Sequence, residues 1–237
     1  MYSTGYFHGG DYANYETEEK PLQLNFRGRI AELKRRHPGG GSLWEVGAAC
    51  GYFLQAASAH FTVAGCDISE WASQQARDRF GLDVRCQDYL SINCPHPLDV
   101  VCMWDTIEHL RAPEAYVQKA ASDLRPGGTL ALSTGDIGSI VARLRRRNWR
   151  LLTPPFHLHF FAARSMRALL HRTGFEAVDI RYLPFWRSAD TIAHRLVAYP
   201  EDKPGAALYR ALSRRGLLNF TVPFNSFDIM TVHARKR

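Results

Sequence analysis

Two glycines and an aspartate form the chemically most informative pattern in this chain. Gly47 and Gly51 follow a short apolar run, and Asp67 comes twenty residues after Gly47, at the end of a second one. Glycine adopts backbone torsions that cost other residues energy, and it lets the backbone pass close to a ligand. An aspartate at that spacing can accept both hydroxyls of a ribose. Because bulky Tyr52 and Phe53 stand where a dinucleotide fingerprint has a further glycine, we expect a nucleoside without pyrophosphate; an ordinary turn beside a solvated aspartate is the alternative.

The elements that position these residues alternate between strands and helices, which predicts an α/β fold. We expect a Rossmann-like, mostly parallel seven-stranded sheet with helices on both faces and an antiparallel last strand. Parallel strands bring their carboxyl ends to one edge, where ligands bind. The predicted helices cover residues 20–36, 51–59, 70–80, 113–124 and 164–173, with two more expected within 184–223. The predicted strands cover residues 43–47, 62–67, 83–87, 98–103, 128–133, 175–182 and 227–234.

From residue 43 to residue 174 the chain resembles the class I S-adenosylmethionine-dependent methyltransferases, in particular the small-molecule O-methyltransferases of quinone and natural-product pathways. The resemblance is carried by the turn 47–51, the segment 87–89, the strand exit 98–110, the turn 124–130 and the segment 157–175. One departure is Ala49, which stands in the middle of the family's run of alternate glycines. An alanine keeps this turn small, so we expect binding to be retained.

The resemblance implies S-adenosyl-L-methionine as cofactor. The turn and the acid before it, Glu45, should bind the amino-acid part of the cofactor. Asp67 should bind the ribose, and Ile68 should lie against the adenine. The end of the third strand should bind the adenine, and the end of the fourth should face the methyl-transfer cleft. A cap or turn role is the alternative for the acid at the third strand. Tyr89, next to it, should offer either its ring or its backbone amide to the adenine. The expected cofactor-binding residues are Glu45, Gly47, Ala49, Gly51, Asp67, Ile68, Asp88, Tyr89, Trp104 and Asp105.

Three histidines are the candidate catalytic residues. A hydroxyl acceptor needs a base, and histidine titrates near neutral pH, which favours His157 or His159. Their spacing puts them on opposite sides of an extended segment, so one of them should face the acceptor, and we favour His157. The resemblance adds His109, which follows an acid. Packing of these histidines within the loop is the alternative.

We predict no metal at the site. His157 and His159 with Asp105 have suitable ligand types for a divalent ion, but too few carboxylates accompany them. We therefore expect activity to survive chelation.

The chain is expected to form one methyltransferase domain over residues 1–237. Residues 1–40 should supply an aromatic N-terminal lid and a helix, and residues 134–162 and 184–223 should be insertions that build a cap or acceptor site. The first insertion carries an arginine cluster, residues 143–150, which could grip an anionic or lipid-linked acceptor or form a solvated face.

Composition narrows the class of protein. The chain has a formal net charge of +7, five scattered cysteines and no stretch approaching eighteen uninterrupted apolar residues. We expect a cytoplasmic enzyme, monomeric or homodimeric, that methylates a small molecule, most readily on a hydroxyl oxygen. A methyltransferase acting on RNA or protein and a non-catalytic S-adenosylmethionine-binding protein remain alternatives, although the strand exit lacks the motifs of amino-directed enzymes.

Overall fold

A computed structural model describes residues 15–94, 96–194 and 205–237, with the side chains from residue 21 onward. The described chain forms two compact units. The first contains residues 32–183 and 226–237, and the second contains residues 15–31, 184–194 and 205–225. Each is described by itself. The predicted aromatic lid falls mainly on residues 1–14, outside the described residues, and the prediction of a single domain with cap insertions stays a prediction.

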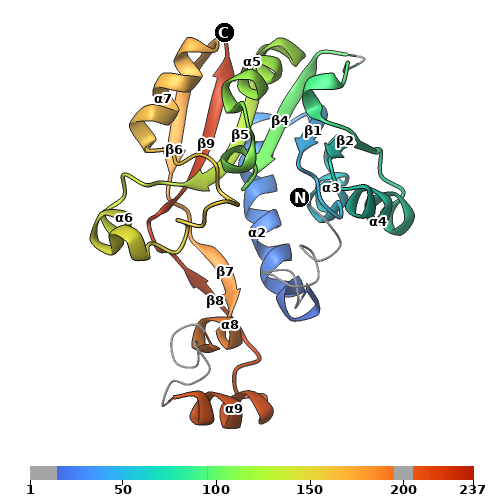
Figure 1. The fold of residues 1–237 in the computed structure, drawn as a ribbon. Coiled ribbons are helices and arrows are strands. Elements are labelled where there is room, and N and C mark those ends of the chain that lie inside the picture. Colours follow the sequence, from blue (N-terminus) through green and yellow to red (C-terminus); the bar gives the residue numbers. More distant parts are fainter. Residues whose placement is uncertain (1–14, 95, 195–204) are drawn as a thin grey trace. The chain divides into compact units, whose positions relative to one another are not determined.

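The first unit is built on a seven-stranded sheet of order β3-β2-β1-β4-β5-β9-β6 (Figure 1). Strands β1 to β5 pair in parallel, whereas β9 pairs antiparallel with β5 on one side and β6 on the other. This topology confirms the predicted fold class. The strands are β1 (Ser42–Val46), β2 (Thr62–Asp67), β3 (Val84–Cys86), β4 (Leu98–Trp104), β5 (Leu124–Gly135), β6 (Phe175–Arg181) and β9 (Ile229–Lys236).

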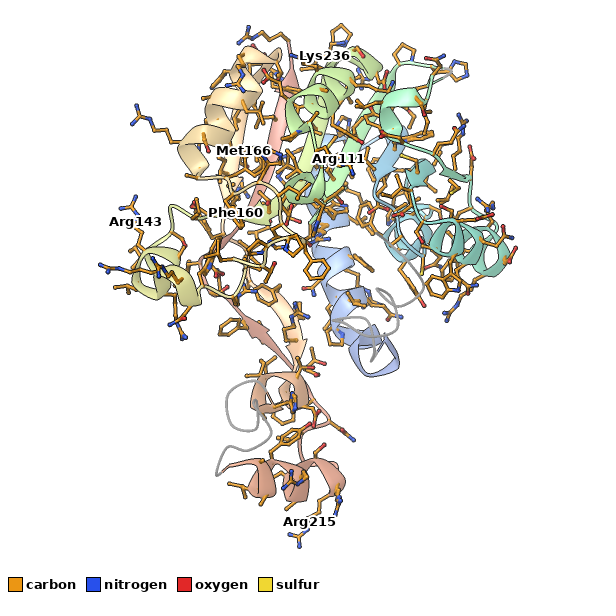
Figure 2. The ribbon with its side chains drawn as sticks, in the orientation of Figure 1. Arg111, Arg143, Phe160, Met166, Arg215 and Lys236 are labelled. Carbon is orange, nitrogen blue, oxygen red and sulfur yellow. The ribbon has the colours of Figure 1, made fainter. Side chains whose placement is uncertain are left out.

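Helices flank this sheet, and local sequence signals set their ends. Helix α4 (Glu70–Phe80) begins where the Ser69 hydroxyl accepts a hydrogen bond from the Ala72 amide, and it ends at Gly81, whose φ is 65°. Helix α7 (Ala163–Arg172) buries Met166, which lies between that helix and the sheet (Figure 2). The other helices of this unit are α3 (Tyr52–Ala57), α5 (Pro113–Asp123), α6 (Ile140–Arg145), the short turns η1 (Tyr89–Ser91), η2 (Ile107–His109) and η3 (Arg146–Asn148), and the end of α2 (Tyr15–Arg36).

The core of the first unit is continuous across the sheet. Trp44, Met103, Leu130 and Phe175 are at most 2% exposed and belong to one cluster. Burying side chains of this size contributes about 1.5–3 kcal/mol each, so the strands that carry the site stand on a well-packed base. None of the described helices is both long enough and apolar enough to cross a membrane.

The second unit contains a two-stranded antiparallel sheet of β7 (Phe185–Ser188) and β8 (Thr221–Phe224). The Asn25 side chain bonds both the amide and the carbonyl of Trp186, which fixes the first half of α2 to β7. Two short helices complete the unit, α8 (Ala189–Ala193) and α9 (Ala206–Arg214), and the Asp190 carboxylate joins them by accepting bonds from Tyr209 and Ser213.

Most predicted elements lie within a few residues of the observed ones, and β2 and α4 coincide with their predictions. The structure differs in two places. Helix α6 lies in the stretch 134–161, where the sequence predicted no regular element, and β7 and β8 add a small sheet to the segment where only two helices were expected.

Candidate active site

The glycine turn after β1 has the backbone conformation that its sequence predicted. The φ angles are 76° at Gly47, 77° at Gly51 and 45° at Ala49, all in the left-handed region. A Cβ on Gly47 would lie 2.7 Å from the Thr106 hydroxyl, and one on Gly51 would lie 2.9 Å from the Cβ of Ala76. Torsion and contact with neighbouring protein atoms therefore both require glycine at these two positions.

Asp67 points toward this turn. Its Oδ2 accepts a hydrogen bond from the Ala49 amide at 2.9 Å, and its Oδ1 accepts one from the Ser69 amide at 2.8 Å. Burial raises the pKa of the Asp67 carboxyl, and the amide bonds counteract that rise. A carboxylate oxygen can accept more than one hydrogen bond, so both oxygens keep capacity for ligand hydroxyls.

Two aliphatic side chains near Asp67 and Asp88 face solvent. Ile68 follows β2 and is 57% exposed, and Leu90 follows β3 and is 42% exposed. Because β2 and β3 are paired neighbours, these residues extend from adjacent strand ends at one edge of the sheet. Exposed apolar surface of this kind suits the flat face of a base. The sequence argument identified Ile68 but not Leu90.

Asp88 and Tyr89 have different roles from each other. Asp88 caps η1 by accepting from the Leu90 amide, and the Tyr116 hydroxyl donates to the same oxygen, Oδ1. The capping alternative for Asp88 is thus part of its geometry. The ring of Tyr89 is only 1% exposed and its hydroxyl donates to Asp123, so the expected ring contact with a cofactor does not fit. Only the backbone of Tyr89 is left for recognition.

Glu45, Trp104 and Asp105 occupy the ends of the two central strands. Glu45 lies one residue before the end of β1 and is 4% exposed. Trp104 is also buried, with its ring edge against Phe53 at 5.4 Å between centroids, so it packs in the core instead of facing an open cleft. Asp105 is exposed with φ at 50°, and its carboxylate accepts a bond from the Ser133 hydroxyl.

Glu108, His109 and His157 converge just beyond the end of β4. One ligand atom of each lies within 4.8 Å of the others, and the two imidazole rings meet edge to face with centroids 4.8 Å apart. The His109 Nδ1 contacts the Phe156 carbonyl at 2.8 Å, and the His157 Nδ1 contacts the Leu151 carbonyl at 2.7 Å. A carbonyl only accepts, so each Nδ1 carries the proton and each Nε2 keeps its lone pair.

The surroundings shift the ionisation of this cluster. Burial and the neighbouring Asp105 raise the pKa of the Glu108 carboxyl. Burial also lowers the pKa of His109, which keeps this imidazole neutral near pH 7. The cluster therefore combines a carboxyl that resists ionisation with a histidine that resists protonation. Perturbed groups gathered at a strand edge are typical of functional sites.

His159 lies in a separate place from this pair. It lines a hollow of about 480 Å³ together with Pro113, Phe161 and the ion pair of Glu114 with Arg172. The structure thus brings together two of the three candidate histidines, His109 and His157, and sets the third apart. His157 and His159 therefore have different surroundings, and which of them faces the acceptor stays a prediction.

The segment after β5 is anchored at one point and exposed at another. Asp228 is fully buried, and its carboxylate accepts hydrogen bonds from the Trp149 indole and from Arg150. Around α6, by contrast, Ile140 is 77% exposed, and Arg143 extends at the surface of the segment (Figure 2). The arginine cluster thus consists of one anchoring member and several solvent-facing ones.

Glu108 is the site residue for which the sequence argument assigned no role. A signal was present, because an acid directly before His109 follows an apolar strand and stands next to buried Ile107. What the sequence did not show is its proximity to His157. That contact depends on a loop whose course periodicity cannot predict.

Comparison with known proteins places these features in a family. A family model described as a methyltransferase domain matches residues 20–180. The chain belongs to this methyltransferase family. A search of curated proteins finds no significant match.

Several solved structures share the fold at low sequence identity. One is a Thermotoga maritima protein described as a possible histamine N-methyltransferase, 18% identical with a TM-score of 0.61 over 96% of this chain and 95% of that one. Another is magnesium protoporphyrin IX methyltransferase from Synechocystis PCC 6803 with bound SAH, 15% identical with a TM-score of 0.61 over 94% and 86%. A third is the N-methyltransferase NodS from Bradyrhizobium japonicum WM9 in complex with S-adenosyl-L-homocysteine, 15% identical with a TM-score of 0.54 over 89% and 86%.

Proposed function

We propose that this protein is an S-adenosylmethionine-dependent methyltransferase whose acceptor is the hydroxyl oxygen of a small molecule. The observation that carries the proposal is the position of Asp67, whose carboxylate bonds the Ala49 amide within the glycine turn. A carboxylate that can bind ribose hydroxyls is thus joined to a backbone turn at the carboxyl ends of adjacent strands. This arrangement suits a nucleoside cofactor.

The residues present fit this cofactor. Asp67 would hold the ribose hydroxyls, and exposed Ile68 and Leu90 would lie against the adenine. Both bonds of Asp88 fall on Oδ1, so its Oδ2 can accept from an adenine amino group. Glu45 and the turn amides would serve the amino-acid end. The solved NodS and magnesium protoporphyrin IX methyltransferase structures contain S-adenosylhomocysteine, which supports the same assignment.

The histidine pair supports an oxygen acceptor. When bound, S-adenosylmethionine supplies an electrophilic methyl group on a sulfonium, from which the neutral thioether S-adenosylhomocysteine is a good leaving group. A hydroxyl acceptor must give up its proton as its oxygen gains the methyl. His157 is our first candidate to take that proton, because its Nε2 lone pair is available and its ring is held by the Leu151 carbonyl. His109 has the same arrangement and is the second candidate.

Two finer features of the proposal rest on other observations. All five cysteines are free thiols, which supports a reducing, cytoplasmic setting. The solvent-facing arginines near α6 support an anionic or lipid-linked acceptor. Charge reversal at Arg146 should then raise KM for an anionic acceptor and leave cofactor affinity unchanged.

The test has two stages. Calorimetry with S-adenosylmethionine and S-adenosylhomocysteine should give one site per chain, and absence of binding at millimolar concentration would end the proposal. Purified protein is then assayed with radiolabelled donor against phenols, quinols, hydroxy acids and sugars, with tRNA and peptides as competing acceptor classes. Transfer only to tRNA or peptide would refute the small-molecule acceptor.

The histidine assignment is tested once an acceptor is found. We expect His157→Gln to lower kcat by about 10²–10⁴-fold, the usual contribution of a general base. His159→Gln, on the same loop but in another hollow, is the matched control and should retain most of the rate. Equal losses for both variants would argue against His157 as the base.

A further inference from the structure

The His109 and His157 imidazoles are oriented as metal ligands usually are. A histidine that binds a metal generally donates its other ring N–H to a carbonyl or carboxylate, which fixes the tautomer and the ring plane. Here each Nδ1 is 2.7–2.8 Å from a backbone carbonyl, and the rings lie edge to face. Because each Nδ1 is bonded to a carbonyl, Nε2 is the ring nitrogen left for a ligand, and the two ring centroids are 4.8 Å apart.

A buried carboxylate oxygen completes the set. Glu108 is 5% exposed, and within the described part of the chain its Oε2 has no hydrogen-bond partner. The nearby Thr134 side chain favours the ionised form of the Glu108 carboxyl, whereas the charge of Asp105 disfavours it. An orphaned buried oxygen costs about 1–3 kcal/mol, and a cation would remove that cost together with the repulsion between the two acids.

The spacing suits a single ion. Zinc bonds nitrogen and oxygen at about 2.0–2.2 Å, so three ligands spread around one ion lie about 3.3–3.8 Å apart. The three groups offer atoms within 4.8 Å of one another, so shifts of up to about 0.7 Å in each side chain would bring them onto one centre.

The backbone holds the set together. The Glu108 carbonyl accepts hydrogen bonds from the amides of Leu158 and His159, at 2.8 and 3.1 Å. These bonds pin the loop that carries His157 directly to the turn that carries Glu108 and His109. The three side chains therefore occupy fixed positions on two segments about fifty residues apart.

We infer that Glu108, His109 and His157 form a binding site for one divalent transition-metal cation. Two imidazoles and one carboxylate favour Zn²⁺, Co²⁺ or Fe²⁺ over Mg²⁺ and Ca²⁺, which prefer oxygen ligands. The sequence argument weighed a metal at His157, His159 and Asp105 and rejected it because too few carboxylates accompany them, whereas the structure groups His157 with His109 and Glu108. Three protein ligands leave at least one position for an oxygen from solvent or acceptor.

The site has a consequence that rests on the proposed function. With a cation bound, the histidine lone pairs are used for coordination and cannot take a proton. A hydroxyl of the acceptor that coordinates the ion would lose its proton more readily, to water, and its oxygen would then accept the methyl. An acceptor with two adjacent oxygens would suit such a centre best, because both could bind the same ion.

The experiment uses the full chain, stripped with a chelator, with no cofactor or acceptor present. Zn²⁺ binding is measured by competition calorimetry, and Co²⁺ binding by its visible absorption bands. We expect one ion per chain, and a dissociation constant weakened by at least about 100-fold in Glu108→Gln and in His157→Gln. His159→Gln is the matched control and should bind Zn²⁺ like the wild type. Circular dichroism and binding of S-adenosylhomocysteine verify that each variant is folded.

Each outcome decides the inference. It is overturned by the absence of stoichiometric Zn²⁺ binding, by unchanged binding in His157→Gln, or by Mg²⁺ binding as tightly as Zn²⁺. If Glu108→Gln fails to fold, His157→Gln alone carries the test. Zn²⁺ binding without methyl transfer would count against the proposed function only. Methyl transfer that survives chelation in protein that binds no Zn²⁺ would reject the cation site and leave the histidine base in place.

Discussion

Replacing Gly47 with alanine tests how the turn after β1 supports the site. The substitution adds a Cβ at a residue whose φ is 76° and places it 2.7 Å from the Thr106 Oγ1 and 2.8 Å from its Cγ2. A left-handed torsion costs a non-glycine residue about 1–2 kcal/mol. Forcing extra volume into a packed position destabilises the protein by about 1–3 kcal/mol. Alanine also lowers the entropy of the unfolded chain relative to glycine, which stabilises the folded state by about 0.4–1 kcal/mol. We therefore expect a loss of about 2–4 kcal/mol in the free energy of unfolding.

Two further variants separate the torsional part from the steric part. Gly81 has φ of 65° and nothing within 4 Å of an added Cβ, so Gly81→Ala should lose only the torsional part, at most about 1–2 kcal/mol. Thr106→Ala removes both colliding atoms, although it also loses the bond from the threonine hydroxyl to the Trp104 carbonyl. In the double variant we expect a coupling of about 1–2 kcal/mol that partly rescues Gly47→Ala.

The assays are urea unfolding followed by circular dichroism and calorimetric titration with S-adenosylhomocysteine. The amides of Gly47 and Ala48 both donate to the Cys66 carbonyl, next to Asp67, so a displaced turn moves the ribose ligand as well. Affinity should fall by about 10-fold or more in protein that is still folded, which corresponds to about 1.4 kcal/mol. Gly47→Ala with wild-type stability and affinity, or strictly additive losses with Thr106→Ala, would refute the steric reasoning.

Two more predictions concern cofactor affinity and pH. Asp67→Asn removes a charged hydrogen-bond acceptor and should weaken S-adenosylhomocysteine binding in calorimetry by about 10–100-fold. The control variant Asp83→Asn, at an exposed position, should have no effect. Unchanged affinity in Asp67→Asn would contradict the ribose assignment. His233 is 3% exposed, and burial lowers its pKa to about 4. The pKa of His233 is lower in the folded state than in the unfolded state. Its contribution to the free energy of unfolding is therefore fully present above about pH 6.5 and is lost as pH falls toward 4. Between pH 7.5 and pH 5, urea unfolding of the wild type should therefore lose about 2 kcal/mol more than that of His233→Leu, and parallel losses would show that His233 is not buried in the neutral form.

The cofactor half of the site could be predicted because its signals are local. Gly47, Gly51 and Asp67 lie within one strand-turn-helix-strand unit, where torsional demands and strand order follow from neighbouring residues. The turn has left-handed torsions and Asp67 bonds the Ala49 amide within it, whereas ribose binding stays a prediction. Of the two roles expected for Tyr89, its buried ring leaves the backbone amide, a choice that alternation could not make because it does not tell which face of a strand end turns toward the core.

The acceptor half could be predicted less well because it depends on contacts between distant segments. Glu108 and His157 are 49 residues apart in the sequence. They lie close together because the Glu108 carbonyl accepts hydrogen bonds from the amides of Leu158 and His159. No periodicity encodes such a bond. The β7–β8 pair was missed for a related reason, since both strands are short and Pro223 interrupts β8, which weakens its strand signal.

The position of β9 has a consequence for how the chain reaches its folded state. This strand is the last described element to be synthesised, yet it lies between β5 and β6 and pairs with both. Until it emerges from the ribosome, β5 and β6 each expose an unpaired edge, and such edges promote association between chains. A nascent or truncated chain that ends before Ile229 should therefore depend on chaperones, even though every residue of the cofactor pocket has already been made.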